Sequence, residues 1–232
     1  MTIEVKGNIV SDIVGTLYER MGVEDYTSPK KVKAQLKDSA FSNAITVNVA
    51  SNGGDVFAAS EIYTMLRDSG KKVTVNIQGL AASAASVISM AGDTVRISPT
   101  AQIMIHKASN GIQGNADGMS HNASVLNGID KSIAAAYVAK TGMKESDLIQ
   151  MMSNETWLTA KDAVDKGFAD EIMFNDEANS QNYQNSTFGT VITDAVATQF
   201  LNSIQQTEKQ PSQPTNSVRE QKLAILLNKG EN

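Results

Sequence analysis

The stretch GLAASAASVISMAG, residues 79–92, combines very small side chains with three serines and carries no charged residue. It follows KKVTVNIQGL (71–80), which has the alternation of a β-strand, and its own composition predicts a tightly packed helix. The serines have two interpretations at this point. They fill space where nothing larger fits, or one of them is a nucleophile, and Ser86 and Ser89 compete with Ser83 for that role.

Strands and helices alternate along the chain on both sides of this stretch. The hydrophobic patterns predict further strands at residues 3–10, 45–51, 94–98 and 101–106. They predict helices at residues 12–22, 29–37, 57–68, 115–140, 145–152 and 159–167. Repeated strand–helix–strand units indicate a parallel sheet with right-handed crossovers, so we expect an α/β fold.

A change in composition after residue 174 divides the chain. Residues 1–174 form the predicted folded domain. Residues 175–232 contain long runs of Asn, Gln, Ser and Thr, which are typical of flexible segments. We interpret them as a polar, partly disordered tail with two candidate helices, at 188–206 and 217–228. A partner-binding arm is the alternative interpretation of this tail.

The overall composition argues against several classes of function. The formal net charge of −5 over 232 residues shows no basic surplus, so we expect no nucleic-acid partner. Because the chain has no cysteine and only two histidines, we expect no disulfide, no metal site and no cofactor. No apolar run reaches the roughly 18 residues of a membrane span, and no signal peptide is recognisable. The sequence predicts a cytoplasmic protein without a membrane partner.

Candidates for a nucleophile and its helpers stand at the ends of predicted strands. Ser83 follows one strand at the start of a helix, where N–H groups and the positive helix end favour a developing anion. His106 ends another strand, and the turn Gly53-Gly54 can aim a backbone N–H into a pocket. Each feature also has an ordinary structural explanation. Spacing alone therefore predicts an α/β domain that could be a serine hydrolase, and no more.

Four longer segments make the prediction more specific. They are SNGGDVFAASEIYTML, GLAASAASVISMAGD, MIHKASNGIQGNADG and NETWLTAKDAVDKGFAD. In order and spacing they resemble the Clp protease proteolytic subunit family (ClpP), and among its members the divergent ClpP-related head maturation proteases of phages and prophages. The resemblance covers roughly residues 1–174. It implies the ClpP/crotonase-type fold, a repeated β-β-α superhelix with a parallel sheet and a long "handle" helix, and serine endopeptidase activity by acyl-enzyme chemistry.

The resemblance implies a role for individual residues. Ser83 matches the family nucleophile, and His106 matches its general base. The backbone N–H groups of Gly54 and Ala84 match the oxyanion hole. The family's Ser-Pro-Gly-Gly turn reads Ser-Asn-Gly-Gly at residues 51–54, so we expect a looser turn that keeps its donor.

The third member of the catalytic triad departs from the family pattern. The family has an aspartate where this chain has Glu155, in the segment NETWLTA. A glutamate is one methylene longer, but it can still accept the ring N–H of His106, as it does in some hydrolases. We favour Glu155, and Asn154 is the alternative. If neither reaches the histidine, the enzyme is a slow dyad.

The resemblance also implies how substrates and partners bind. Gly111, Ile112, Gln113 and Gly114 match an edge strand that pairs with an extended polypeptide substrate through main-chain hydrogen bonds. The family forms homo-oligomeric rings, such as heptamers or stacked rings. Because the chain has no phosphate-binding GxxxxGK[ST] motif, ATP-driven unfolding would come from a separate ATPase. A phage role would add capsid or portal proteins as partners and place the protein in the host cytoplasm.

Two other functions stay open at the level of the sequence. One is a crotonase-like acyl-CoA enzyme, which also uses paired backbone N–H groups on an oxyanion. The other is a catalytically weak or inactive ClpP-like scaffold, and Glu155 in place of an aspartate favours it.

Overall fold

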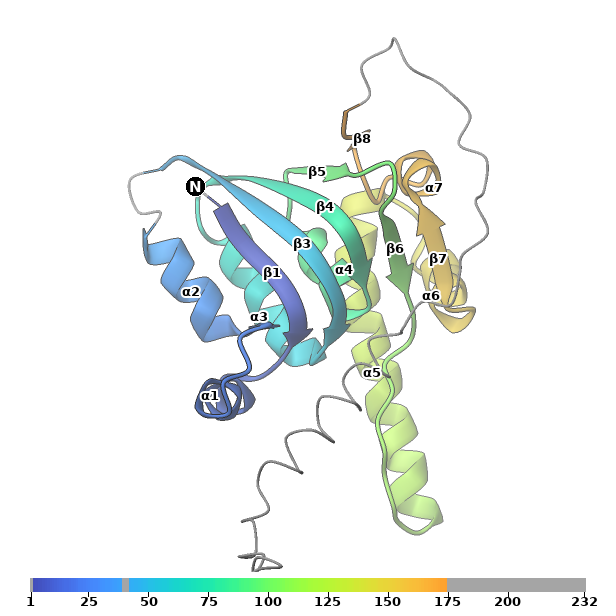
Figure 1. Ribbon diagram of the computed structural model, residues 1–232. Coiled ribbons are helices and arrows are strands. Elements are labelled where there is room, and N and C mark those ends of the chain that lie inside the picture. The colour runs from blue at the N-terminus through green and yellow to red at the C-terminus, as the bar shows by residue number, and fades with distance from the viewer. Residues whose placement is uncertain (1, 39–41, 175–232) are drawn as a thin grey trace, which may run out of the picture. The chain divides into compact units, whose positions relative to one another are not determined.

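The computed structural model describes residues 2–38 and 42–174 of the chain (Figure 1). The strands in this part are β1 (Thr2–Ile9), β2 (Tyr26–Thr27), β3 (Ala44–Gly54), β4 (Lys72–Ala82), β5 (Thr94–Ile97), β6 (Gln102–Ile105), β7 (Thr156–Thr159) and β8 (Glu171–Ile172). The helices are α1 (Asp12–Arg20), α2 (Pro29–Asp38), α3 (Val56–Arg67), α4 (Ala84–Ser89), α5 (Ala116–Thr141), α6 (Glu145–Ser153) and α7 (Ala160–Asp165).

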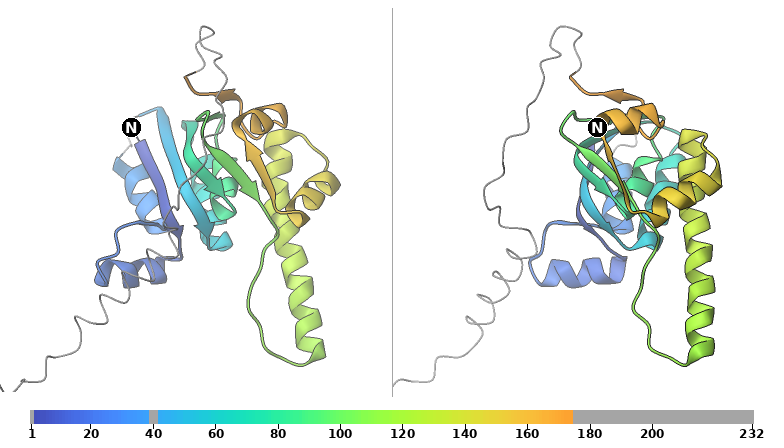
Figure 2. Two further views of the ribbon diagram at one scale, coloured as in Figure 1. Left: turned by 45° about the vertical axis from the view of Figure 1, so that its right-hand side comes forward. Right: turned by 90° about the vertical axis from the view of Figure 1, so that its right-hand side faces the viewer.

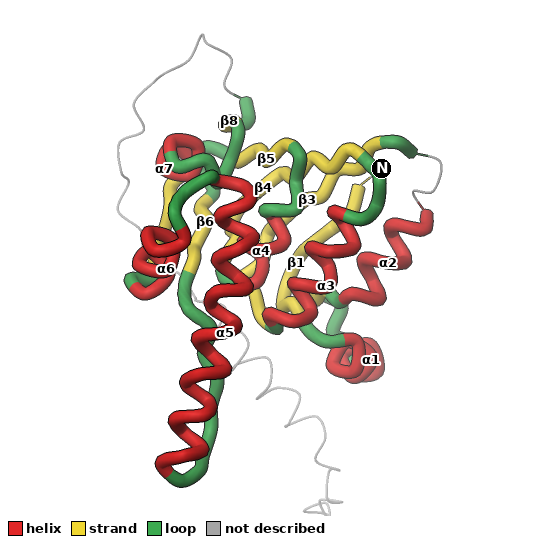
Figure 3. Tube along the Cα trace, turned by 180° about the vertical axis from the view of Figure 1, so that it is seen from behind, coloured by secondary structure: helices red, strands yellow, loops and turns green. Residues whose placement is uncertain are grey.

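The strands form one sheet in which most neighbouring strands are parallel. The order is β2-β1-β3-β4-β5-β8, and each neighbouring pair in this row is parallel. Figure 3 shows α2, α3, α4 and part of α5 on one side of the sheet, and Figure 1 shows the opposite side of β1, β3 and β4. The predicted α/β class with a parallel sheet is confirmed.

Burial alternates along the central strands, because the helices pack on one side of the sheet. In β3, Ile45, Val47 and Val49 are buried, whereas Thr46 and Asn48 between them are partly exposed. This period of two is the one that a pleated strand gives to its side chains. The buried side chains join those of α3 and α4 in one core.

β4 is long enough to pair with two different strands on one edge. Its residues 74–77 pair with β5, and its residues 80–82 pair with β6, both in parallel. β6 in turn pairs antiparallel with β7. The hydrophobic pattern predicts neither β7 nor the two-residue strands β2 and β8, and the last two are too short to show an alternation.

The stretch 79–92 divides between strand and helix, which corrects the prediction of a helix over its whole length. Residues 79–82 continue β4, and α4 covers only Ala84–Ser89. The strand extends this far because β6 offers residues 80–82 a partner. All the residues of α4 are buried, in agreement with the tight packing that small side chains predict.

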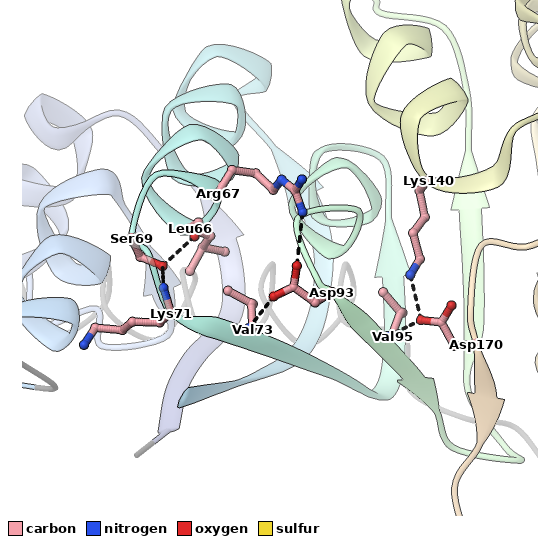
Figure 4. Close-up of polar contacts among 9 residues, drawn as sticks. All are labelled: Leu66, Arg67, Ser69, Lys71, Val73, Asp93, Val95, Lys140 and Asp170. Carbon is pink, nitrogen blue, oxygen red and sulfur yellow. Dashed lines mark hydrogen bonds and ion pairs between the residues drawn. The ribbon is translucent and has the colours of Figure 1, made fainter. Parts of the chain in front are cut away.

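Two aspartates make the same contact just before successive strands (Figure 4). Asp93 precedes β5 and accepts the Val73 N–H of β4 at 2.8 Å, and Asp170 precedes β8 and accepts the Val95 N–H of β5 at 2.6 Å. In each case the aspartate N–H donates back to the carbonyl of the same valine. The two carboxylates also pair with basic side chains of α3 and α5. These contacts fix the register at the amino ends of the strands.

The predicted long helix is α5, and local chemistry sets both of its ends. The Asn115 side chain accepts the Gly118 N–H at the N-cap, and Gly142 ends the helix in the left-handed conformation with a φ of 71°. Figure 2 shows the first half of α5 extending away from the sheet, beside the segment that joins it to β6.

The predicted tail, residues 175–232 with its candidate helices at 188–206 and 217–228, lies outside the described residues. The domain boundary after residue 174 therefore stays a prediction. Among the helices of the described part, none is both long and apolar enough to cross a membrane.

The core around β4 generates a prediction about stability. Ile77 is fully buried in β4, and Ile77→Ala is expected to lower the free energy of unfolding by about 2–5 kcal/mol, because it removes buried methyl groups and leaves a cavity. Ile13 on α1 is 84% exposed, so Ile13→Ala is a matched control with an expected change within about 0.5 kcal/mol. Urea unfolding measures both, and equal effects would contradict the packing described above.

Candidate active site

The register of β4 with β6 brings Ser83 and His106 together. Ser83 follows the last residue of β4, and His106 follows the last residue of β6. Ala82 pairs with Met104, and the Ser83 N–H donates to the Met104 carbonyl at 2.9 Å. Ser83 Oγ lies 2.7 Å from His106 Nε2, within hydrogen-bond distance. The predicted approach of these two side chains is confirmed.

Ser83 has a backbone conformation that is unusual for a residue with a side chain. Its φ is 53° and its ψ is −123°, a region that costs about 1–3 kcal/mol and persists only where the surroundings fix it. The surroundings do so through both backbone groups. The N–H is bonded to β6, and the carbonyl accepts the Ser86 N–H at 2.9 Å and the Ser86 hydroxyl at 2.5 Å. The strain is therefore held next to the reactive hydroxyl.

The Gly-Gly turn forms the last two residues of β3 and lies against the nucleophile. Gly53 has a φ of 97°, and a Cβ there would lie 2.8 Å from the Cβ of Ser83 and 3.0 Å from the Ala84 nitrogen. The buried Ser51 hydroxyl donates to the Gly7 carbonyl at 2.6 Å and accepts the Gly53 N–H at 3.1 Å. The Ser51 side chain therefore ties this turn to β1, and the looser turn expected without proline stays a prediction.

Four of the predicted site residues line one cavity of about 360 Å³, whereas Glu155 and residues 111–114 lie outside its lining. Gly54, Ser83, Ala84 and His106 contribute to its wall together with apolar side chains of α5. Gly54 is the glycine of this turn that lines the cavity. The N–H of the other glycine, Gly53, is already bonded to the Ser51 hydroxyl. Within the described residues there is no group of three or more His, Cys, Asp or Glu side chains that could hold a metal ion.

Glu155 lies near the histidine but does not contact it. β6 and β7 pair antiparallel up to Ile105 and Thr156, so His106 and Glu155 are the next residues on the two strands. The exposed Glu155 side chain instead accepts the Trp157 indole N–H, with 3.3 Å between Nε1 and Oε1. The alternative residue, Asn154, accepts a hydrogen bond from Gln150. Among the described residues no side chain or carbonyl hydrogen-bonds to His106 Nδ1.

The segment between β6 and α5 differs from the prediction of an edge strand. Residues 111–114 are exposed and form no strand in the single chain, because a strand needs a partner and this segment has none there. The segment is attached to α5 instead. The buried Asp130 accepts the Ala108 N–H at 2.8 Å, and the amides of Asn110 and Asn122 bond to each other reciprocally.

Three residues next to the site escaped the sequence analysis. Asp130 anchors the backbone two residues after His106, Ser51 fixes the Gly-Gly turn, and Trp157 holds the Glu155 carboxylate. An aspartate within an otherwise apolar helix face at residues 129–134 is a signal that could have indicated the first of them. The contacts just named for the other two reach only two residues along the chain, and the hydrophobic pattern carries no signal for the direction of those side chains.

A serine bonded to a histidine, beside a glycine turn and a helix start, is the arrangement of a serine hydrolase. A sequence model of the Clp protease family matches residues 16–176 of this chain. The chain is 32% identical over 131 residues to the ATP-dependent Clp protease proteolytic subunit 1 of Chlamydia abortus, which covers 55% of this chain and 68% of that protein. The ATP-dependent Clp protease proteolytic subunit of Porphyromonas gingivalis is 30% identical over 156 residues, covering 65% and 70%. That of Bacteroides fragilis is 29% identical, covering 65% and 75%. The chain belongs to the Clp protease family.

The Ser83–His106 contact predicts a reactive serine. A fluorophosphonate probe is expected to label the chain on Ser83, and His106→Ala is expected to slow labelling on the order of 10²-fold, because the proton acceptor is lost. Mass spectrometry of the labelled peptide and the labelling rate measure both effects. Ser109 lines the same cavity with an exposed side chain, so Ser109→Ala is the matched control and should label at the wild-type rate. Labelling that does not depend on His106 would contradict the activation of Ser83.

Proposed function

We propose that this protein is a serine endopeptidase that cleaves polypeptides through an acyl-enzyme. The observation that carries the proposal is the 2.7 Å distance between Ser83 Oγ and His106 Nε2 at the wall of a cavity. Membership of the Clp protease family supports the same activity. The chemistry that follows uses only side chains and backbone N–H groups of this chain.

Ser83 attacks the substrate carbonyl while His106 Nε2 takes the hydroxyl proton and becomes an imidazolium. The N–H groups of Gly54 and Ala84 donate to the oxyanion of the tetrahedral intermediate. His106 then gives its proton to the leaving amine, the C–N bond breaks, and the acyl group stays on Ser83. Water attacks this ester with His106 again as the base, and the carboxylic product leaves.

Glu155 is the proposed third member of the triad. Residues opposite each other on antiparallel strands have Cβ atoms about 4.5–5.5 Å apart, and Glu155 directly precedes β7 where His106 directly follows β6. A glutamate side chain spans such a separation by a change of torsion angles. In the catalytic state the carboxylate would accept the Nδ1–H of His106 instead of the Trp157 indole N–H, and stabilise the imidazolium.

The proposed substrate is an extended polypeptide that pairs with residues 111–114. Ala108, Ser109 and Asn110 line the cavity, and the exposed residues 111–114 follow them directly. A peptide whose scissile bond lies at Ser83 can therefore continue along this segment and supply the strand partner that the single chain lacks. Main-chain pairing of this kind binds many sequences.

Assembly into a homo-oligomeric ring is the proposed quaternary state. Apolar side chains on the neighbouring helices α3 and α5 support it: Phe57 is 69% exposed, Met119 53% and Val125 44%. The matched relatives are named as ATP-dependent, and a separate ATPase would supply the unfolding step for this chain.

A role in phage or prophage head maturation is the finer proposal. It rests on the divergence of the motifs and on the composition of residues 175–232. Genes for portal and capsid proteins beside this gene would support the role, and a housekeeping operon around it would count against the role. In a direct assay, the enzyme is expected to cut purified capsid protein.

A weak or inactive scaffold is the second candidate function, and one observation favours it. Glu155 contacts Trp157 rather than His106, so the single chain holds a serine–histidine pair without its carboxylate. Turnover measurements separate this candidate from the peptidase.

Peptide turnover tests the proposed function directly. The wild type is expected to hydrolyse casein and fluorogenic peptides, and Ser83→Ala is expected to lower kcat/KM by on the order of 10⁴-fold or more, because the nucleophile is lost. Ser146→Ala, at an exposed serine of α6 outside the cavity, should keep full activity. Equal rates for the wild type and Ser83→Ala would indicate a scaffold, and binding of an acyl-CoA without peptide turnover would indicate the crotonase-like alternative.

Two substitutions decide whether Glu155 completes the triad. Glu155→Gln is expected to lower kcat on the order of 10²–10⁴-fold with the wild-type fold retained, because the imidazolium loses its carboxylate. Asn154→Ala should leave kcat unchanged, since Asn154 bonds to Gln150. Single-turnover acylation rates and thermal unfolding measure the two effects. The reverse pattern would assign the role to Asn154, and no effect of either variant would identify a dyad.

A further inference from the structure

A buried tyrosine on α5 is connected to the nucleophile without touching the cavity. Tyr137 is 1% exposed, and its ring packs against Phe168 with centroids 5.6 Å apart. Its hydroxyl lies 2.8 Å from Ser86 Oγ, and Ser86 Oγ lies 2.5 Å from the Ser83 carbonyl oxygen. The three residues come from α5, from α4 and from the turn between β4 and α4. We refer to the hydrogen-bonded side chains of Tyr137 and Ser86 as the Tyr137–Ser86 relay.

The direction of the hydrogen bonds in this relay follows from counting protons. The Ser83 carbonyl can only accept, so Ser86 donates its single hydroxyl proton to it. Tyr137 must then donate its proton to Ser86. Burial raises the pKa of Tyr137, so the phenol keeps that proton at the pH values where enzymes work. The relay therefore points from α5 toward the Ser83 carbonyl.

The Ser83 carbonyl belongs to the same peptide plane as the Ala84 N–H. Cis peptide bonds are absent from the described part of the chain, and in a trans peptide the C=O and the N–H point in opposite directions. A hydroxyl that holds the Ser83 carbonyl on the α4 side therefore turns the Ala84 N–H the other way. Ala84 lines the cavity beside Ser83 and Gly54, so this direction is the one that an oxyanion donor needs.

We propose that Tyr137, acting through Ser86, is a positioning residue that orients the Ala84 N–H toward the oxyanion of the transition state. The inference rests on the proposed function, because an oxyanion forms only if Ser83 attacks a carbonyl. The relay orients a donor whose acceptor, the substrate oxygen, gains its charge only in the transition state, and the relay itself touches no substrate group. It should therefore alter kcat and leave KM unchanged.

The test compares Tyr137→Phe with the wild type in the full chain. The variant keeps the ring that packs on Phe168 and removes only the donor, and kcat is expected to fall about tenfold with KM unchanged. The inhibition constant of a peptide aldehyde, which forms a hemiacetal oxyanion on Ser83, should weaken by the same factor. Binding of the non-covalent product peptide should stay the same. A merely structural tyrosine would not separate the aldehyde from the product peptide.

The control and a second variant make the test decisive. Tyr63→Phe removes the same hydroxyl from a partly buried tyrosine on α3 and should change none of these values. Ser86→Ala breaks the relay next to Ser83 and serves if Tyr137→Phe does not fold. Adding Tyr137→Phe to Ser86→Ala should cause little further loss, because the two residues act in series.

The outcomes separate this inference from the proposed function. Unchanged kcat and aldehyde inhibition in folded Tyr137→Phe, with an active wild type, would overturn the relay alone. If the wild type hydrolyses no peptide but Ser83 reacts with the fluorophosphonate, the proposed function fails. The labelling rate, which also depends on the oxyanion donors, then tests the relay. If Ser83 does not react at all, both conclusions are overturned.

Discussion

The parallel pairing of the end of β4 with β6 is the constraint on which the site depends. β5 ends at Ile97, which pairs with Ile77, so the edge of β4 beyond that residue is open to another strand. β6 takes this edge at residues 80–82, and the chain leaves both strands at the same end of the sheet. A slip of one residue in this pairing would turn the following side chains to the opposite face. Ser83 and His106 meet because a short strand next to a long one leaves room for a third.

The small side chains around Ser83 allow tight packing, and the same packing brings backbone N–H groups close to the Ser83 hydroxyl. A Cβ on Gly53 would lie 2.7 Å from the Ala82 carbonyl oxygen, so the Gly-Gly turn at the end of β3 already touches the end of β4. At position 53 only glycine allows the two backbones to approach this closely, because every other residue would place a Cβ there. The approach places the turn that contains Gly54 beside Ala84, and so gathers backbone N–H groups around Ser83. The two interpretations of the alanine-rich stretch are therefore compatible.

The sequence predicts those parts of the protein that depend on local pattern. Period-two alternation located β3 and β4, and the small residues around Ser83 indicated a strand–helix junction with a candidate nucleophile. Local pattern does not predict contacts between segments far apart in sequence, such as the hydrogen bond from the Ala108 N–H to Asp130. It also does not predict the conformation of residues 111–114, because a strand there depends on a partner that the single chain does not contain. The roles of Gly54, Ala84 and Glu155 came from the family resemblance, and they stay proposals.

The position of Glu155 follows from competition between two donors. The Trp157 indole N–H holds the carboxylate at 3.3 Å, longer than the usual N–H···O distance of about 2.9–3.0 Å. A neutral His106 offers an N–H of similar strength, so the resting side chain gains little by moving. In the proposed mechanism the attack of Ser83 makes His106 an imidazolium, and a charge-assisted hydrogen bond is roughly twice as strong as a neutral one. The charge created by the reaction therefore favours the catalytic position of the carboxylate. The extra methylene of glutamate gives it the length to serve either donor, which a shorter aspartate just before β7 would lack.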